Sequence, residues 1–237
     1  MELSGFIVPR SEFSAALTNS LYSIYERYYT PTDRAVFERD LARKTFCIIL
    51  SDRAGQRCGF STVERMDLHI SGRETVVLFS GDTVIDRAYW GEQVLPFTWI
   101  ELAGRIKAER PDVPLYWLLV SKGHRTFRYL PAFARQYWPR PESDAHLRLV
   151  ANNIATRIFG ARYDPARGVI LADTACPTAL RPEFQAMDRA RMSNKHVQYF
   201  LAQNPHHDAG EELVCLCELS VENLRPWALR QFRKGLE

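Results

Sequence analysis

The stretch that decides the fold is residues 75–122, which read TVVLFSGDTVIDRAYWGEQVLPFTWIELAGRIKAERPDVPLYWLLVSK. It begins with a short apolar run at 76–79 and ends with another at 115–120, both rich in strand-favouring residues. Between them, apolar residues recur at helical spacing over 94–110. A strand, a helix and a strand of this length predict a right-handed parallel crossover.

Polar residues gather between the first strand and the helix, over 80–93. Ligands of strand–helix–strand units tend to bind at this place. Gly81, within the polar run from Ser80 to Thr83, predicts a bulge or a close backbone approach. Gly91 precedes the helix, whose free N–H groups and dipole favour an anion. The alternatives are an ordinary turn at each glycine, with Asp82 capping or solvated.

The remaining pattern predicts further strands and helices around this unit. The predicted strands cover 6–8, 45–50, 57–66, 169–171 and 212–219. The predicted helices cover 11–27 with Ser11 as cap, a segment starting at 31–33, 124–138 with a break or start at Pro131, 144–159, 183–204 and the residues after 221. We expect one α/β domain over 1–237, with 141–204 as an additional, mainly helical segment before the last strand.

Composition excludes several classes of protein. The 237 residues are 46% hydrophobic and carry a net charge of only +3, which supports a substantial core and argues against a nucleic-acid binder. Five cysteines do not form a disulfide or zinc pattern, so we interpret them as reduced, mostly buried thiols. No apolar run approaches membrane-spanning length and no secretory signal is visible, so we expect a cytoplasmic protein.

The order of elements resembles that of the GNAT superfamily of acetyltransferases, and the resemblance covers about residues 6–138 plus the last strand. In the loop VIDRAYWGEQ, which ends at Gln93, Val84, Tyr89 and Gly91 fit the family pattern. Trp90 replaces the usual arginine or glutamine, and Gln93 and Leu95 replace small residues. The resemblance implies a mixed, centrally splayed sheet of about six to seven strands flanked by helices.

The resemblance also implies an acyltransferase site between the two parallel strands. A bulge near Gly81 would expose a backbone N–H that polarises the acyl thioester carbonyl. Asp82 or Glu64 would act as the base. Tyr129, chosen over Tyr137 because it is nearer the strand end, would protonate the leaving thiolate. The expected donor-binding residues are Phe79, Ser80, Gly81, Arg87, Tyr89, Trp90, Gly91, Glu92, Gln93 and Arg125.

The expected activity is transfer of an acyl group from a coenzyme A thioester to an amine or hydroxyl acceptor. The altered loop leaves room for an acyl-carrier protein as donor, because its pantetheine lacks the adenosine diphosphate portion. We expect no metal and no permanently bound cofactor. The alternative is a non-catalytic acyl-CoA-binding module on the same fold. The additional segment could cover the acceptor site or form a dimer surface.

Overall fold

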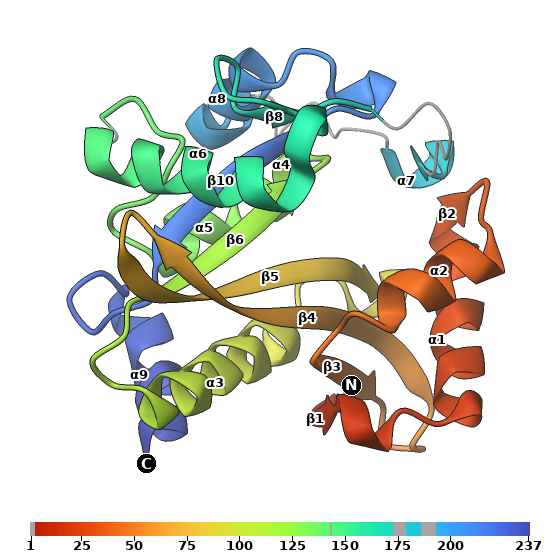
Figure 1. The fold of residues 1–237 in the computed structure, drawn as a ribbon. Helices are drawn as coiled ribbons and strands as arrows, with labels where there is room; N and C mark the ends of the chain where they lie inside the picture. The colour runs from red at the N-terminus through yellow and green to blue at the C-terminus, as the bar shows by residue number, and fades with distance from the viewer. Residues whose placement is uncertain (1–2, 143, 173–178, 186–192) are drawn as a thin grey trace.

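The centre of the molecule is an eight-stranded sheet (Figure 1). The structure is a computed structural model that describes residues 3–142, 144–172, 179–185 and 193–237. The strand order is β1-β3-β4-β5-β6-β10-β8-β7, and β2 and β9 form a separate pair. The strands are β1 (Ser4–Pro9), β2 (Tyr29–Thr30), β3 (Phe46–Ser51), β4 (Arg57–Ile70), β5 (Arg73–Ile85), β6 (Leu115–Ser121), β7 (Tyr163–Asp164), β8 (Val169–Ile170), β9 (Ala179–Leu180) and β10 (Glu212–Glu218).

Helices cover both faces of this sheet. They are α1 (Ala15–Tyr28), α2 (Arg34–Leu41), α3 (Val94–Glu109), α4 (His124–Phe127), α5 (Tyr129–Phe133), α6 (Ala145–Phe159), α7 (Pro182–Gln185), α8 (Lys195–Gln203) and α9 (Pro226–Leu236). One face carries α3, α4, α5, α8 and α9, whose apolar residues share a core with the sheet. The other face carries α1 and α2 over β3 and β4, and α6 over β6 and β10.

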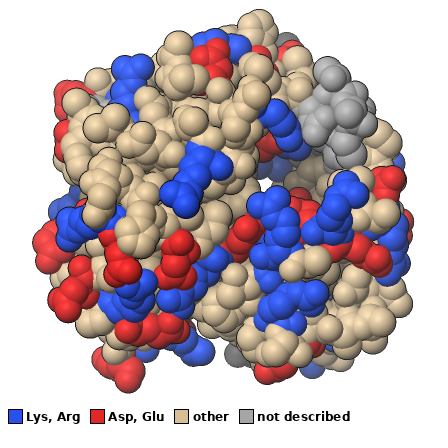
Figure 2. Space-filling model, in the orientation of Figure 1, with Lys and Arg blue, Asp and Glu red and all other residues tan. Residues whose placement is uncertain are grey.

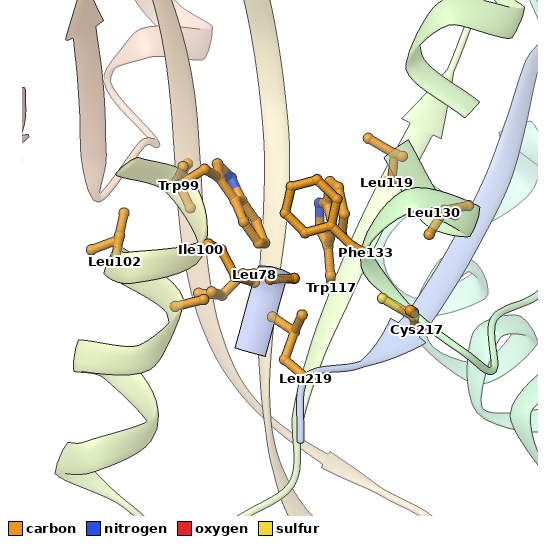
Figure 3. Packing of buried hydrophobic residues seen from close by; sticks show 14 of the residues in the cluster. Leu78, Trp99, Ile100, Leu102, Trp117, Leu119, Leu130, Phe133, Cys217 and Leu219 are labelled. Atoms are coloured by element: carbon orange, nitrogen blue, oxygen red, sulfur yellow. The ribbon is translucent and has the colours of Figure 1, made fainter. Parts of the chain in front are cut away.

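The predicted crossover is confirmed. Within the described residues β5 and β6 form the one parallel pair, joined by α3. Their inner residues pack on α3 (Figure 3), and the ring centre of Trp99 lies 4.4 Å from that of Trp117. The last strand, β10, returns to the sheet antiparallel to β6. The sheet therefore confirms the predicted fold class, with eight strands because two short strands, β7 and β8, extend it beyond β10.

Short polar side chains start several of the helices. Ser14, Asp33, Asp144 and Asn194 each accept a hydrogen bond from a backbone N–H of the first turn. The prediction that Ser11 caps the first helix is wrong. Ser11 lies in a single 3-10 turn, and the α-helix begins only after Ser14.

The predicted helix over 124–138 is also interrupted. Two short helices, α4 and α5, end at Phe133, and extended chain follows in which Ala134 and Trp138 form β-bridges to Leu224 and Leu216. Backbone hydrogen bonds to the C-terminal part of the chain thus replace the helical ones. The apolar stripe predicted for this segment is nevertheless buried: Phe127, Leu130, Ala134 and Tyr137.

Several remaining predictions concern single residues or chain segments. Four cysteines are free and buried: Cys47, Cys58, Cys215 and Cys217. Cys176 and residues 186–192 of the predicted helix over 183–204 lie outside the described residues. Among the described helices, none has the length and apolar character needed to cross a bilayer.

Candidate functional site

The two parallel strands part at one end of their pairing. The register runs from Val76 opposite Leu115 to Ser80 opposite Leu119 and ends there. Beyond this point β5 continues to Ile85 paired with β4 alone, while the end of β6 pairs with β10. Figure 1 shows β5 and β6 diverging, and Figure 2 shows a hollow in the surface in this region, bordered by Lys and Arg side chains. The sheet is thus split at the place where the sequence predicts a ligand.

A β-bulge lies directly at this split. The pairing of β4 with β5 shifts between Ser61 opposite Thr83 and Val63 opposite Ser80. Thr62 therefore faces two residues of β5, Gly81 and Asp82, and the extra residue bends that strand. The polar run predicted as a bulge or turn is a bulge inside a continuous strand. From Gly81 onward, the backbone has no strand partner on the side of β6 in the described part of the chain.

A fully buried lysine lies beside the bulge, on the face covered by α2. The Nζ atom of Lys44 is 3.0 Å from Asp40 and 3.6 Å from Oε2 of Glu64. The same atom lies 5.1 Å from the ring centre of Phe79. A Cβ atom at Gly81 would stand 3.2 Å from this Nζ, so glycine allows the ammonium group to approach the strand.

Two polar atoms next to Lys44 have unused hydrogen-bonding capacity. Oγ1 of Thr62 and Oε2 of Glu64 are buried without a hydrogen-bond partner among the described residues. The other oxygen of Glu64 lies 3.4 Å from Arg43. Buried polar atoms seldom lack a hydrogen-bond partner, so these two oxygen atoms indicate a place where a ligand or water completes the hydrogen bonding.

Asp82 differs from Glu64 in its surroundings. It forms no ion pair in the described part of the chain, and it is the second of the two bulge residues, after Gly81. Burial, followed by the nearby Asp40 carboxylate, raises the pKa of Asp82 to about 6, although Lys44 and Lys122 oppose the shift. A carboxyl group with this pKa can take up and release protons close to neutral pH.

The start of α3 forms the second half of the site. Gly91 has a φ of +103°, which glycine adopts without strain, and no atom lies within 4 Å of the place of a Cβ. Gln93 is the N-cap residue, but its side chain donates to the carbonyl of Gly91 instead of capping the helix. Pro96, the third residue of α3, has no N–H to offer a ligand. The helix end therefore presents fewer donors than an all-amide first turn.

The ring of Trp90, beside the start of α3, contacts residues that follow each of the two diverging strands. The guanidinium carbon of Arg125, on α4, lies 4.4 Å from the ring centre of Trp90, and that of Arg87 lies 5.9 Å from it. The indole Nε1 donates to the carbonyl of Ile85 at 2.8 Å, which fixes the ring over the end of β5. Phe184 of α7 meets the same ring at 6.2 Å. Trp90 thus holds two cations next to the start of α3.

The other predicted residues lie at varying distances from these two groups. Ser80 points to the α3 face and accepts a hydrogen bond from Trp117 at 2.8 Å. Tyr89 turns toward Asp52 of the β3–β4 turn, and Glu92 is exposed. Tyr129 is half-buried on α5 against Phe133, and burial raises the pKa of its phenol. No contact joins Tyr129 to the bulge in the described part of the chain.

The structure thus brings the predicted residues together as two groups. Glu64, Phe79, Gly81 and Asp82 gather at the bulge, and Arg87, Trp90, Gly91, Gln93 and Arg125 gather at the start of α3. Sequence reasoning missed Lys44 and Phe184. Lys44 follows Asp40 by four residues, a spacing that predicts an ion pair but not burial. Phe184 carries no sequence signal that separates it from any core aromatic.

Similarity to known proteins is found at the level of structure. No protein-family model and no curated protein sequence matches the chain. Among solved structures, a conserved Enterococcus faecalis protein described as a probable N-acyltransferase aligns with a TM-score of 0.42 and 11% identity. That alignment covers 58% of this chain but 33% of the other.

Two further solved structures illustrate the range of the similarity. The Escherichia coli GNAT family N-acetyltransferase YhbS, in complex with CoA, aligns at a TM-score of 0.38 and 14% identity over 56% of this chain and 70% of its own. Saccharomyces cerevisiae N-myristoyltransferase with bound myristoyl-CoA aligns with a TM-score of 0.38 and 7% identity. That alignment covers 52% of this chain and 30% of the other. The GNAT superfamily, to which the E. coli protein is assigned by name, is the one that the order of elements in the sequence resembles.

Proposed function

We propose that this protein is an acyltransferase that moves an acyl group from a thioester donor to an amine or hydroxyl acceptor. The observation that carries the proposal is the split between β5 and β6 with the bulge at its edge. The split gives a thin pantetheine arm a way into the sheet, and the bulge frees backbone groups that could polarise the thioester carbonyl. Holding both reactants in this place would lower the entropic part of the barrier.

The proposed reaction assigns a task to each group of residues. The acceptor nitrogen or oxygen forms a bond to the acyl carbon, and the bond from that carbon to sulfur breaks. A carboxylate at the bulge takes the acceptor's proton, and the departing thiolate picks up a proton to leave as a free thiol. Tyr129 is the proposed donor of that proton, because it lies on α5 shortly after the end of β6 and a phenol is protonated at neutral pH.

We propose that the donor is bound through its pantetheine arm more than through a nucleotide. The start of α3 has Gln93 and Leu95 where the resembled superfamily has small residues, and Pro96 removes one N–H. Arg87 and Arg125 beside Trp90 would hold the pantetheine phosphate by charge-assisted contacts. This arrangement suits either an acyl-CoA or an acyl-carrier protein.

The test is release of free thiol from acyl thioesters in the presence of a panel of amines and alcohols. The wild-type protein is expected to turn over acyl-CoA and the matching acyl-phosphopantetheine with kcat/KM values within about tenfold of each other. Within the CoA series, acetyl and long-chain donors define the acyl length. Absence of thiol release with every donor, together with absence of binding, would overturn the proposal.

The second candidate function is a non-catalytic binding module for acyl thioesters. It is favoured by the replacements at Trp90, Gln93 and Leu95, which a protein that has given up catalysis can tolerate. Calorimetric titration separates the two functions in combination with the thiol assay. Saturable binding of acyl-CoA without any thiol release supports the module, whereas binding with release supports the enzyme.

A further inference from the structure

We propose that Lys44 separates the roles of the two carboxyl groups at the bulge. Lys44 engages Glu64 in a buried ion pair and leaves Asp82 as the group that takes the acceptor's proton, so Lys44 is a positioning residue. This inference rests on the proposed function and deepens it, because it names which carboxylate works and which residue makes the choice.

The position of Lys44 is the first reason. Its side chain is 1% exposed, and its Nζ atom is joined to Asp40 at 3.0 Å and to Glu64 at 3.6 Å. A buried ammonium group is tolerated only with such anionic partners. Asp40 and Glu64 together balance the charge of the Lys44 ammonium group.

The surroundings of Glu64 are the second reason. Its side chain is 12% exposed and lies between two cations, with one oxygen 3.4 Å from Arg43 and the other 3.6 Å from Lys44. Each oxygen of Glu64 therefore already faces a cation, so this carboxylate is engaged in ion pairs before an acceptor arrives.

Asp82 has no such restraint. It lies on the bulge itself, beside the backbone that has lost its partner on the β6 side. The charged and titratable groups around it come from several elements: Asp40 of α2, Lys44 after α2, Lys122 after β6, Glu212 of β10 and Tyr29 of β2. Lys122 is itself paired with Glu212 at 3.6 Å, so its charge is shared. Burial raises the pKa of Asp82 into the range that suits a base near neutral pH.

The unused hydrogen-bonding atoms give a separate indication that a ligand enters here. Oγ1 of Thr62 belongs to a residue that is 1% exposed, and it faces Gly81 across the bulge. Together with Oε2 of Glu64, it offers a bond to a donor group placed beside Asp82. A primary amine, which has more than one N–H, can donate to Asp82 and to these atoms together.

The first test is the pH dependence of kcat/KM for thiol release. For the wild-type protein we expect an acidic limb with a midpoint near 6, because the working carboxylate must be deprotonated. Asp82→Asn is expected to lower kcat/KM by about a hundredfold or more and to abolish that limb. Glu64→Gln is expected to keep the limb. The reverse pattern would overturn the inference.

The second test uses the lysine itself. Loss of a cation raises the pKa of a neighbouring carboxyl group, so Lys44→Met should move the limb to higher pH by about one unit. Lys44→Arg keeps the charge and should restore the wild-type midpoint. Arg39→Met removes an exposed cation from α2 and serves as the matched control, with no displacement expected. An equal displacement in both Met variants would contradict the role of Lys44.

A direct titration keeps the inference testable if no donor is turned over. The side-chain carboxyl carbon of Asp82 can be followed by NMR in the protein without ligand, with circular dichroism as the check on folding. We expect a midpoint near 6 that rises in Lys44→Met and returns in Lys44→Arg. If Lys44→Met does not fold, Glu64→Gln answers the same question, since Asp82 must keep its midpoint near 6. A midpoint in the ordinary aspartate range would overturn the inference whatever the activity.

Discussion

Gly81 joins two features that are separate in the sequence, the bulge in β5 and the buried ammonium of Lys44. A Cβ at this position would lie 2.4 Å from Oγ1 of Thr62 and 3.0 Å from Cε of Lys44. Both neighbours are buried and cannot move freely. The absence of a side chain is therefore a steric requirement of the site.

The first prediction is that Gly81→Ala destabilises the protein by about 1–3 kcal/mol, the usual cost of overpacking. It should also reduce turnover, because Thr62 and Lys44 must shift. Urea denaturation and the thiol assay measure the two effects. Gly123→Ala is the control, since a Cβ there meets no atom within 4 Å. Equal stability of the two variants would show that the bulge relaxes without cost.

The second prediction concerns stability against pH. The folded-state pKa of Asp82, about 6, lies above the value of 3.8 for the free group. The protonated carboxyl group is thus favoured by folding, and its contribution is complete below pH 4 and lost as the pH rises through 6. Asp82→Asn should therefore raise the free energy of unfolding by about 2 kcal/mol at pH 8. At pH 4 it should have little effect.

Chemical denaturation at the two pH values checks this prediction. Asp112→Asn removes the same charge at an exposed position and should leave the difference between pH 4 and pH 8 unchanged. If Asp82→Asn gives the same result as Asp112→Asn, Asp82 is not destabilised by its surroundings.

At the scale of single residues, the sequence predicts the bulge but not the environment that gives it chemistry. Gly81 and Asp82 interrupt an apolar run, and such an interruption is visible without a structure. Lys44 and Glu64 meet only because the fold places β4 beside the residue that follows α2, and no local pattern in the sequence encodes that contact. The closeness of Arg125 and Trp90 likewise depends on two strands that run in the same direction, so that the residues following each lie at the same edge of the sheet.

Among the secondary-structure elements, α3 and α9 make an unusually close contact. A Cβ at Gly104 would lie 2.1 Å from the carbonyl oxygen of Phe232, and one at Gly235 would lie 2.1 Å from that of Glu101. The two helix backbones thus touch directly, and neither position has room for a methyl group. This contact fixes the C-terminal helix on the helix whose start lies in the site.

The third prediction is that Gly104→Ala and Gly235→Ala each lower the free energy of unfolding by more than about 2 kcal/mol, since backbone atoms cannot yield to a methyl group. The double variant should cost less than the sum, because the first substitution already separates the helices. Lys234→Ala, exposed on the same turn, is the control. Strict additivity in thermal or urea unfolding would contradict a shared contact.

The sequence predicts best those elements in which apolar residues recur with a clear helical or strand period. The crossover, α6 after its cap Asp144, and the return of β10 to the sheet follow the predicted pattern. The segment after β6 does not, because its apolar stripe fits a helix while its backbone is drawn into bridges with residues more than seventy positions away. The sequence does not predict the pairing of β2 with β9, since a strand of two residues is too short to show a hydrophobic period.

Across the whole molecule, a C-terminal segment reaches back to the N-terminal helices. β9 pairs with β2, Arg181 donates to the carbonyl of Glu26 at 3.1 Å, and Phe184 lies 4.7 Å from the ring of Tyr28. The same phenylalanine touches Trp90. We propose that this contact belongs to the additional segment, residues 141–204, and that it covers one side of the site.

The fourth prediction is that Phe184→Ala loosens this connection without unfolding the core. Hydrogen exchange measured by mass spectrometry should show faster exchange in β2 and at Arg181, whose N–H donates to Tyr28, while β5 and β6 stay protected. Glu183→Ala, exposed on the same short helix, should change neither. Unchanged exchange in Phe184→Ala would mean that the backbone pairing alone holds the segment.

The place of β10 in the sheet has a consequence for biosynthesis. This strand, residues 212–218, lies between β6 and β8 in the interior of the sheet, and α9 then closes over α3. While a ribosome is still elongating the chain, β6 has an open edge and α3 an uncovered apolar face, both of which invite association with other nascent polypeptides. Folding of this protein is therefore expected to be completed only after residues 212–236 have left the exit tunnel.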